Sequence, residues 1–297
     1  MAAASLPAPA RRWVERVCGA PPGPAIRLAG ASTAAVEAFR AGGRRLVIKR
    51  FVHRFFVEED PGRAGHEAAL LDLLGPTPVP APGLVAVDRD GSEAGVPAVL
   101  MEHLPGRRTV PNPCPRATAE MLAEIHGIAP GVPYTFRRHL DGVEGVSPPS
   151  WARRAGLWER AIERAAGPGP QSAIGLIHRD ANDGNLLWDG PRVTGVVDWL
   201  SGCRGPLGVD LARVRVDLAL RGEWEAASEV LAAYRRVGAQ DAHHPHWDVV
   251  DALDLLPYYR GRDAVAEWTG PAGNSAAAAA VRRGLERFLG EAMAELG

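Results

Sequence analysis

The sequence predicts an α+β protein with two lobes, an N-terminal lobe with an antiparallel sheet plus one helix and a mainly helical C-terminal lobe. Strand-like runs bounded by glycine and proline fill residues 26–101. Beyond residue 106 most apolar positions recur at helical spacing. The 297 residues suffice for two sizeable cores. We expect a lead-in over 1–25, a sheet lobe over 26–101, a hinge over 102–106 and a helical lobe over 107–297.

The chain begins with a segment that we expect to be peripheral. Prolines surround a short helix predicted at 11–17, and prolines and glycines punctuate the chain outside regular structure. A hairpin follows, with strands at 36–39 and 46–51 joined by the turn Gly42-Gly43. The sheet lobe therefore starts with this hairpin.

Small residues precede the first strand of this hairpin, in the run Leu28–Ala34. A tip without bulky side chains lets backbone N–H groups approach phosphates, and hydroxyls add further donors. Gly30, Ser32 and Thr33 are therefore candidate nucleotide contacts. A plain turn is the alternative, because only one glycine occupies the tip.

Lys49 is the single lysine among 34 basic residues, so the other 33 are arginines. A coding bias that writes arginine wherever either cation serves would explain the arginines. The planar fork of arginine and the compact ammonium of lysine are not interchangeable. Because Lys49 ends an apolar strand, Leu46–Ile48, it marks a position where a fork does not fit. Chance retention is the alternative.

An amphipathic helix is predicted over 62–74, ended by Gly75-Pro76. Its Glu67 is placed to pair with Lys49 and hold it toward phosphate, or else is a solvated helix charge. Strands are expected at 84–87 and 96–101, before the hinge. Adenine would lie against the second of these strands and be recognised through main-chain groups; the candidate residues are Val99, Met101 and Glu102.

The stretch 174–200 carries the chemistry. An apolar run leads into the loop His178–Asn185, and two short strands then surround the turn signal at 189–191. Because an antiparallel hairpin folds back on itself, Asp198 at its end should return beside Asn185 at its start. The alternative is a polar hairpin whose Asp and Asn residues only serve turns.

The order Asp180, Asn185, Asp198 and its spacing is that of a kinase catalytic loop followed by a metal-binding aspartate. Magnesium takes oxygen ligands, which Asn185 and Asp198 supply. Asp180 would accept a proton from the attacking hydroxyl or orient it. We therefore predict a phosphoryl-transfer centre that uses ATP or GTP with Mg²⁺.

The C-terminal lobe is predicted from helical periodicity. His126 near the end of its first helix is expected to be structural, and Asp210 to cap a helix or to bond back to the catalytic loop. Helices are expected at 117–128, 151–166, from 205, 223–236, 247–260 and 275–296.

Acidic residues gather in the C-terminal half, and each is expected to be a solvated helix charge, although together they could attract a polycationic acceptor. They include Asp241, Asp248, Asp251, Asp254, Asp263 and Glu267. The histidines 243, 244 and 246 match no zinc spacing, so we expect a surface loop there.

Composition narrows the function classes. A net charge of −1 gives no basic signal for nucleic acid or an anionic membrane. Three widely separated cysteines form neither a disulfide framework nor a metal cluster, which favours a reducing compartment. The chain also contains no Walker-type or Gly-x-Ser-x-Gly motif and no apolar run of membrane-spanning length. We expect a soluble cytoplasmic enzyme.

Taken together, these motifs resemble the aminoglycoside phosphotransferase and choline kinase-like family, over roughly residues 26–260. The resemblance rests on Lys49, Glu67, the helix 122–126, His178-Arg179-Asp180 with Asn185, Val197-Asp198-Trp199 and Asp210-Leu211-Ala212. It implies a bilobal protein-kinase-like fold. By position it implies Asp180 as base, Asn185 and Asp198 as magnesium ligands, Lys49 as phosphate contact and Glu67 as its anchor.

Two positions depart from the family pattern: Asp183 stands where proline is common, and Leu200 where an acidic residue is common. Because no Phe-Gly follows Asp198 and no Ala-Pro-Glu segment follows later, a regulated protein kinase is disfavoured. We expect a kinase acting on a hydroxyl of a small molecule, aminoglycoside-like or other. The alternatives are a non-catalytic nucleotide-binding module of pseudokinase type and a protein kinase.

Overall fold

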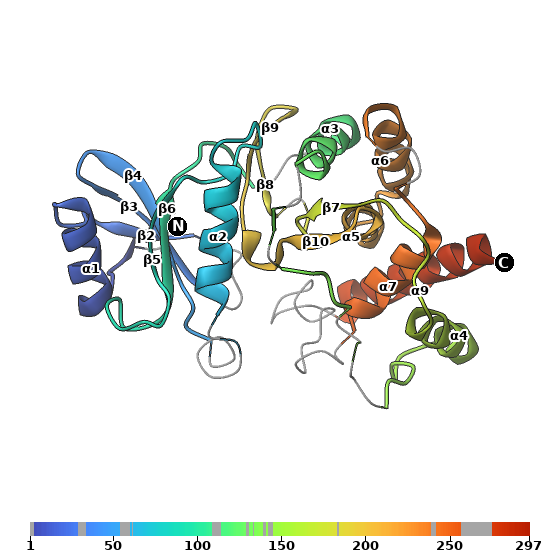
Figure 1. Ribbon diagram of the computed structural model, residues 1–297. Helices are drawn as coiled ribbons and strands as arrows, with labels where there is room; N and C mark the ends of the chain where they lie inside the picture. The colour runs from blue at the N-terminus through green and yellow to red at the C-terminus, as the bar shows by residue number, and fades with distance from the viewer. Residues whose placement is uncertain are drawn as a thin grey trace. The chain divides into compact units, whose positions relative to one another are not determined.

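The computed structural model divides into two compact units, which are drawn in Figure 1. One unit, here called the sheet unit, comprises Met1–Thr109 and Gly184–Gly202, and the other, the helical unit, comprises Val110–Asp183 and Cys203–Gly297. The structure describes residues 3–28, 34–53, 60, 62–108, 114–128, 131–132, 134–138, 141, 145–182, 184–238, 242–256 and 275–297.

The sheet unit is organised around a six-stranded antiparallel sheet with the order β1-β2-β3-β4-β6-β5. Its strands are β1 (Ala3–Ala4), β2 (Ala25–Arg27), β3 (Ala35–Ala41), β4 (Arg44–Arg50), β5 (Leu84–Asp88) and β6 (Ala98–Glu102). Gly42 and Gly43 join β3 to β4 with φ of 55° and 78°, as a tight hairpin turn of this hand requires.

Two helices cover opposite faces of this sheet, α1 (Ala8–Cys18) and α2 (Arg63–Leu74) (Figure 1). Because side chains alternate along a strand, Leu46 and Ile48 of β4 face α1, where they pack with its Trp13. Lys49, the residue after Ile48, faces α2 instead, where it pairs with Glu67. Each helix therefore buries one face of the same strand.

The N-terminal segment is more deeply built in than expected of a peripheral lead-in. β1 adds an edge strand by pairing Ala3 with Ile26 and Ala4 with Ala25. α1 buries Ala10, Trp13 and Val14 in the core under the sheet. The apolar face of this helix explains the difference, since burying an indole ring removes a large apolar area from water.

The hairpin β8 (Leu186–Asp189) and β9 (Arg192–Val196) belongs to the sheet unit, although it lies in the range expected for the helical lobe. Trp188 and Arg107 exchange two backbone hydrogen bonds of 2.8 and 2.9 Å, and Val196 N–H donates to the Pro80 carbonyl at 2.9 Å. These main-chain bonds to chain segments that precede residue 110 explain the grouping.

The helical unit is built around α5 (Gly208–Leu220), in which every residue except Arg213 and Arg215 is buried. α5 packs against α6, α7 and α9, while α3 packs against α6 and against β7. The other elements among the described residues of this unit are α3 (Pro115–His126), α4 (Ala155–Ala166), α6 (Trp224–Val237), α7 (Pro245–Asp254), α9 (Ser275–Leu296), β7 (Ile174–Ile177) and β10 (Cys203–Pro206).

Two details of this unit differ from or add to the sequence prediction. Residues 203–206 form β10, antiparallel to β7, so the predicted helix begins only at Gly208. The buried Glu286 of α9 accepts hydrogen bonds of 3.0 Å from Arg153 N–H, Arg154 N–H and the Trp158 indole. A carboxylate at this position complements the N-terminal dipole of α4.

The predicted fold class is confirmed: an antiparallel sheet with helices makes up the first unit, and helices dominate the second. Across the part of the chain that the structure describes, no helix combines the length and the apolar character that spanning a bilayer requires.

Candidate active site

Lys49 lies at the centre of a buried ion-pair cluster in the sheet unit. Its ammonium is 2.8 Å from Glu67 Oε2, 3.0 Å from Glu67 Oε1 and 2.6 Å from Asp198 Oδ1. The exposed fractions of the three side chains are 7%, 1% and 32%. The one lysine in the sequence thus contacts both the helix carboxylate and the carboxylate that follows the hairpin.

Electrostatics explain why Lys49 stays protonated although it is buried. Burial by itself lowers the pKa of its ammonium, but the carboxylates of Asp198 and Glu67 more than offset this, so the pKa is raised. The three donors of a compact ammonium reach both partners at hydrogen-bond distance. A planar guanidinium in this position has a different reach and shape.

One face of α2 holds both Glu67 and the segment after Asp198. Arg63 donates to the Leu200 carbonyl at 2.9 Å, and His66 Nε2 lies 2.7 Å from the Gly202 carbonyl. Burial lowers the pKa of His66, which favours its neutral form. Positions 63, 66 and 67 share a helix face. The turn η2 (Trp199–Ser201) is therefore fixed to the same helix that positions Lys49.

Asn185 and Asp198 lie at the same end of the β8–β9 hairpin. Leu186 pairs with Val196, and Val197 N–H donates to the Asn185 carbonyl at 2.9 Å. Asn185 is buried, and Asp198 adopts a left-handed conformation with φ of 69°. The predicted return of the hairpin is present, whereas magnesium binding by these side chains stays a prediction.

The donor set at this end of the hairpin suits a hard cation. It offers the carboxylate of Asp198 and the side-chain amide of Asn185, and Mg²⁺ prefers such oxygen ligands. The Arg108 guanidinium donates to the Gly184 carbonyl at 2.5 Å and lies 3.4 Å from Asn185 Oδ1. Arg108 thus braces the backbone beside one of the two predicted ligands.

In the helical unit, β7 delivers the loop that contains Asp180. The fully buried Asp210 of α5 accepts the N–H of His178 at 2.7 Å and the N–H of Arg179 at 2.6 Å. His126 contacts Asp210 at 3.3 Å and the Tyr234 hydroxyl at 2.7 Å. Asp210 therefore bonds back to the loop, and His126 is a structural residue, as the sequence had indicated.

Two side chains donate to the Oδ1 atom of the Asp180 carboxylate. Its Oδ1 accepts from Arg213 Nε at 3.1 Å and from Asn182 Nδ2 at 2.9 Å, and its side chain is 41% exposed. Arg213 is also 3.8 Å from Asp251. The sequence had not identified Arg213 as a residue near Asp180. The available signal was its spacing, three positions after Asp210 on the same helix face.

The predicted nucleotide contacts have different outcomes. Gly30, Ser32 and Thr33 lie outside the described residues. Val99 pairs directly with Lys49 and Met101 with Val47, so both share the Lys49 face of the sheet. They remain candidate adenine contacts.

Glu102 is the last of these candidates, and its carboxylate and its backbone N–H both have partners within the sheet unit. Its carboxylate pairs with Arg44 at 2.9 Å, and its N–H donates to the Gly83 carbonyl at 2.9 Å. The next N–H, of His103, donates to the Arg45 carbonyl at 3.1 Å. Adenine recognition by main-chain groups here stays a prediction that has to use other donors.

The expectation of solvated acids and a surface histidine loop is wrong for several residues. Asp248 and Asp251 are buried on α7, and Asp248 contacts both Arg215 and His243. Burial also lowers the pKa of His246 to about 4. Arginine partners on α5 allow these acids to be buried, which helical periodicity alone does not indicate. Asp241, Asp263 and Glu267 lie outside the described residues.

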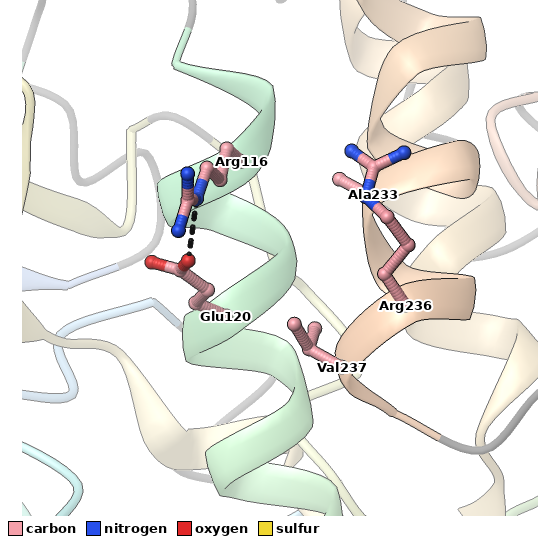
Figure 2. A pocket seen from close by; sticks show the side chains of 5 residues that line it. All are labelled: Arg116, Glu120, Ala233, Arg236 and Val237. Atoms are coloured by element: carbon pink, nitrogen blue, oxygen red, sulfur yellow. Dashed lines mark hydrogen bonds and ion pairs between the residues drawn. The ribbon is translucent and has the colours of Figure 1, made fainter.

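A hollow of about 320 Å³ lies between α3 and α6 in the helical unit. Figure 2 shows the side chains that line it, with Arg116 and Glu120 joined by an ion pair of 2.8 Å. The other lining residues are Ala233, Arg236 and Val237. None of the predicted site residues is among these five, so we assign this hollow no part in the chemistry.

Solved structures with the same fold are numerous. A macrolide 2′-phosphotransferase from Brachybacterium faecium aligns at 20% identity with a TM-score of 0.61, covering 91% of this chain and 97% of that one. A choline/ethanolamine kinase family protein from Mesorhizobium loti aligns at 22% identity with a TM-score of 0.52, covering 88% and 93%.

A thermostable mutant of aminoglycoside phosphotransferase APH(4)-Ia, in a ternary complex with ADP and hygromycin B, is similar over its whole length. It aligns at 14% identity with a TM-score of 0.63, covering 94% of this chain and 97% of that one. No curated protein sequence gives a significant match. At these identities the structural comparisons establish the fold.

The family follows from a sequence comparison that is independent of these structures. The model of the phosphotransferase enzyme family matches residues 27–253, which is well over half of the chain. The matched range includes Lys49, Asp180 and Asp198, and it confirms the resemblance inferred from the motifs. The chain belongs to the phosphotransferase enzyme family.

Proposed function

We propose that this protein is a cytoplasmic kinase that uses ATP or GTP with Mg²⁺ to phosphorylate a hydroxyl of a small, aminoglycoside-like or related acceptor. The observation that carries the proposal is the Lys49 cluster. A buried ammonium held by Glu67 and Asp198 is a stable, permanently charged contact for nucleotide phosphates. Family membership supports the reaction class.

In this proposal Lys49 binds the phosphates of the nucleotide and Glu67 keeps its ammonium in place. Asn185 and Asp198 would hold Mg²⁺, which when bound neutralises charge that develops on the transferred phosphoryl group. Val99 and Met101 lie on the same sheet face as Lys49, where the base of the nucleotide would pack. Further contacts are proposed for Glu102 and for Gly30, Ser32 and Thr33.

Asp180 acts on the acceptor in this scheme. Its carboxylate accepts the proton of the attacking hydroxyl while the oxygen of that hydroxyl forms a bond to the γ-phosphorus. The bond between the γ-phosphorus and the bridging oxygen breaks, and the nucleoside diphosphate leaves. An ordered carboxylate suits this role because its geometry is fixed before the substrate arrives.

The acceptor class is proposed from the acceptors of enzymes that have the same fold. Structures of this fold include an enzyme bound to hygromycin B and a macrolide 2′-phosphotransferase, so hydroxylated antibiotics are the first acceptors to test. Choline-like alcohols are the next, given the similar choline/ethanolamine kinase family protein. Purified enzyme would be screened for ATP consumption against both groups.

The deciding variant is Asp180→Ala. We expect phosphate transfer to fall by about 10²–10⁴-fold, the usual contribution of a positioned general base, with nucleotide binding retained. Asp72→Ala, at an exposed position of α2, is the control and should transfer normally. Normal turnover in Asp180→Ala would contradict the assignment.

The screen also separates the two rival functions. Magnesium-dependent nucleotide binding without transfer to any acceptor would indicate a non-catalytic nucleotide-binding module. Phosphorylation of proteins but of no small molecule would indicate a protein kinase. Neither rival is favoured by a specific observation in the structure.

A further inference from the structure

One face of α5 contacts the Asp180 loop through two side chains of opposite charge. Asp210 accepts the backbone N–H groups of His178 and Arg179, and Arg213 donates to the Asp180 carboxylate. The two residues are three positions apart, which places them on the same helix face. The same rigid element therefore fixes both the loop backbone and the carboxylate.

Arg213 is built into its position. Its side chain is only 13% exposed and lies 3.1 Å from Asp180 and 3.8 Å from Asp251 of α7. A buried guanidinium is costly unless carboxylates compensate it. Desolvation lowers its pKa, but Asp180, Asp251 and Asp217 outweigh that effect and the pKa is raised. Arg213 therefore stays charged across the physiological pH range.

We propose that Arg213 is a positioning residue for Asp180, orienting through Oδ1 the carboxylate that accepts the hydroxyl proton. This inference rests on the proposed function, in which Asp180 is the base. Arg213 itself touches neither the nucleotide nor the acceptor in this scheme, so it acts through Asp180. No sequence motif had singled out Arg213.

Charged side chains from three parts of the helical unit surround Asp180. α5 supplies Arg213 and Asp217, α7 supplies Asp251 and Asp254, and the loop supplies His178 and Arg179, which pairs with Asp254 at 3.5 Å. Removing Arg213 takes away the guanidinium from which Asp180 Oδ1 accepts a hydrogen bond, so the orientation of the carboxylate is less constrained.

The experiment compares Arg213→Met with Arg215→Met. Arg215 is a matched control: it lies on the same helix, its side chain is also 13% exposed, and it pairs with the buried Asp248. The readouts are kcat and KM for the acceptor found in the screen, nucleotide binding and thermal stability.

For Arg213→Met we expect kcat to fall about 10–100-fold, since misorienting a catalytic group by a small distance has effects of this order. KM for the acceptor and nucleotide binding should be nearly unchanged, because Arg213 contacts neither substrate in this scheme. Arg213→Lys, which keeps the charge but loses the fork, should restore part of kcat. Arg215→Met should lose stability but keep kcat.

The outcomes distinguish the two proposals. Wild-type enzyme that transfers phosphate, with Arg213→Met equal to it in kcat, overturns the role of Arg213 alone. Equal losses of kcat in Arg213→Met and Arg215→Met also overturn it, because the effect is then structural. No transfer by the wild type to any acceptor overturns the proposed function and this role with it. If Arg213→Met does not fold, Arg213→Lys decides: unchanged kcat contradicts the proposal.

Discussion

The sheet unit and the helical unit each hold a buried cation between a buried carboxylate and a partly exposed one. In the sheet unit Lys49 contacts Glu67, whose side chain is 1% exposed, and Asp198, which is 32% exposed. In the helical unit Arg213 contacts Asp251, which is 9% exposed, and Asp180, which is 41% exposed. In both clusters the exposed carboxylate is the one with a proposed direct role in transfer.

The two clusters differ in how well the buried carboxylate is paired. Lys49 reaches Glu67 at hydrogen-bond distance, whereas Arg213 stays 3.8 Å from Asp251. Desolvation, only partly offset by Arg213, raises the pKa of Asp251 to about 7. The compact ammonium of Lys49 therefore pairs with two carboxylates at once. The guanidinium of Arg213 donates to Asp180 and leaves Asp251 less well paired, so the ionisation of Asp251 depends on pH near neutrality.

Each cluster lies beside or includes a non-glycine residue with a left-handed backbone conformation. Among the residues that the structure describes, Arg179 and Asp198 are the two non-glycine residues with positive φ, at 68° and 69°. Such conformations cost about 1–3 kcal/mol each and are found where surrounding contacts enforce them. Asp210 supplies those contacts for Arg179, and Val197 with η2 does so beside Asp198.

We expect the largest loss of activity when Lys49, the cation of the sheet-unit cluster, is replaced. Lys49→Met leaves Glu67 buried without its ammonium and removes the proposed phosphate contact. We expect kcat/KM to fall by about 10²–10³-fold, the usual effect of losing one preorganised electrostatic contact to a transferring group. Lys49→Arg should recover little, because the fork does not reproduce two contacts at once. Steady-state kinetics measures both variants.

Arg44→Met is the control for that prediction. Arg44 is on the same strand, but its ion pair with Glu102 joins two side chains that are about half exposed. Such pairs contribute at most about 1 kcal/mol, so activity should be close to that of the wild type. Wild-type kinetics in Lys49→Met would exclude the phosphate role and remove the parallel between the two clusters.

Sequence reasoning reached the sheet-unit cluster because its signals are local. Lys49 was conspicuous as the one lysine, Glu67 sat on a clear amphipathic helix, and a hairpin pattern brings its two ends together whatever surrounds it. The strands of the sheet were likewise visible from runs between glycines and prolines. Gly30, Ser32 and Thr33, expected to contact phosphates, lie outside the described part of the chain.

The helical-unit cluster was less accessible for a physical reason. Arg213 is one of 33 arginines, and nothing in its neighbourhood shows that it is desolvated. Asp251 was expected on a solvated face because helical periodicity treats every charge as exposed. Only the packing of α5 against α7 reveals that the two charges compensate each other in the interior.

The pH sensitivity of the helical-unit cluster is tested by Asp251→Asn. The folded pKa of about 7 lies above the ordinary value near 4, so the folded state keeps a proton that the unfolded state has lost between these pH values. This contribution to stability is complete below about pH 4 and is lost as pH rises to about 7. Asparagine cannot ionise and escapes that loss.

The stability of Asp251→Asn relative to the wild type should therefore increase by roughly 2 kcal/mol between pH 5 and pH 8. Denaturant unfolding at both pH values measures the difference. Asp189→Asn, at a side chain that is 77% exposed, is the control and should show no such trend. A relative stability of Asp251→Asn that is the same at both pH values would mean that Asp251 is ionised throughout.

We expect the smallest effect on kinetics when Glu67, the best-paired carboxylate, loses only its charge. Glu67→Gln keeps a hydrogen-bond acceptor beside Lys49 but replaces a charge-assisted bond by a neutral one, a difference of about 1 kcal/mol. KM for the nucleotide should rise about fivefold, with kcat nearly unchanged if Lys49 still reaches the phosphates. Glu67→Ala should raise KM for the nucleotide further, since it leaves the Lys49 ammonium with Asp198 as its remaining carboxylate partner in the cluster. Equal kinetics for the two variants would mean that shape and not charge is what Glu67 contributes.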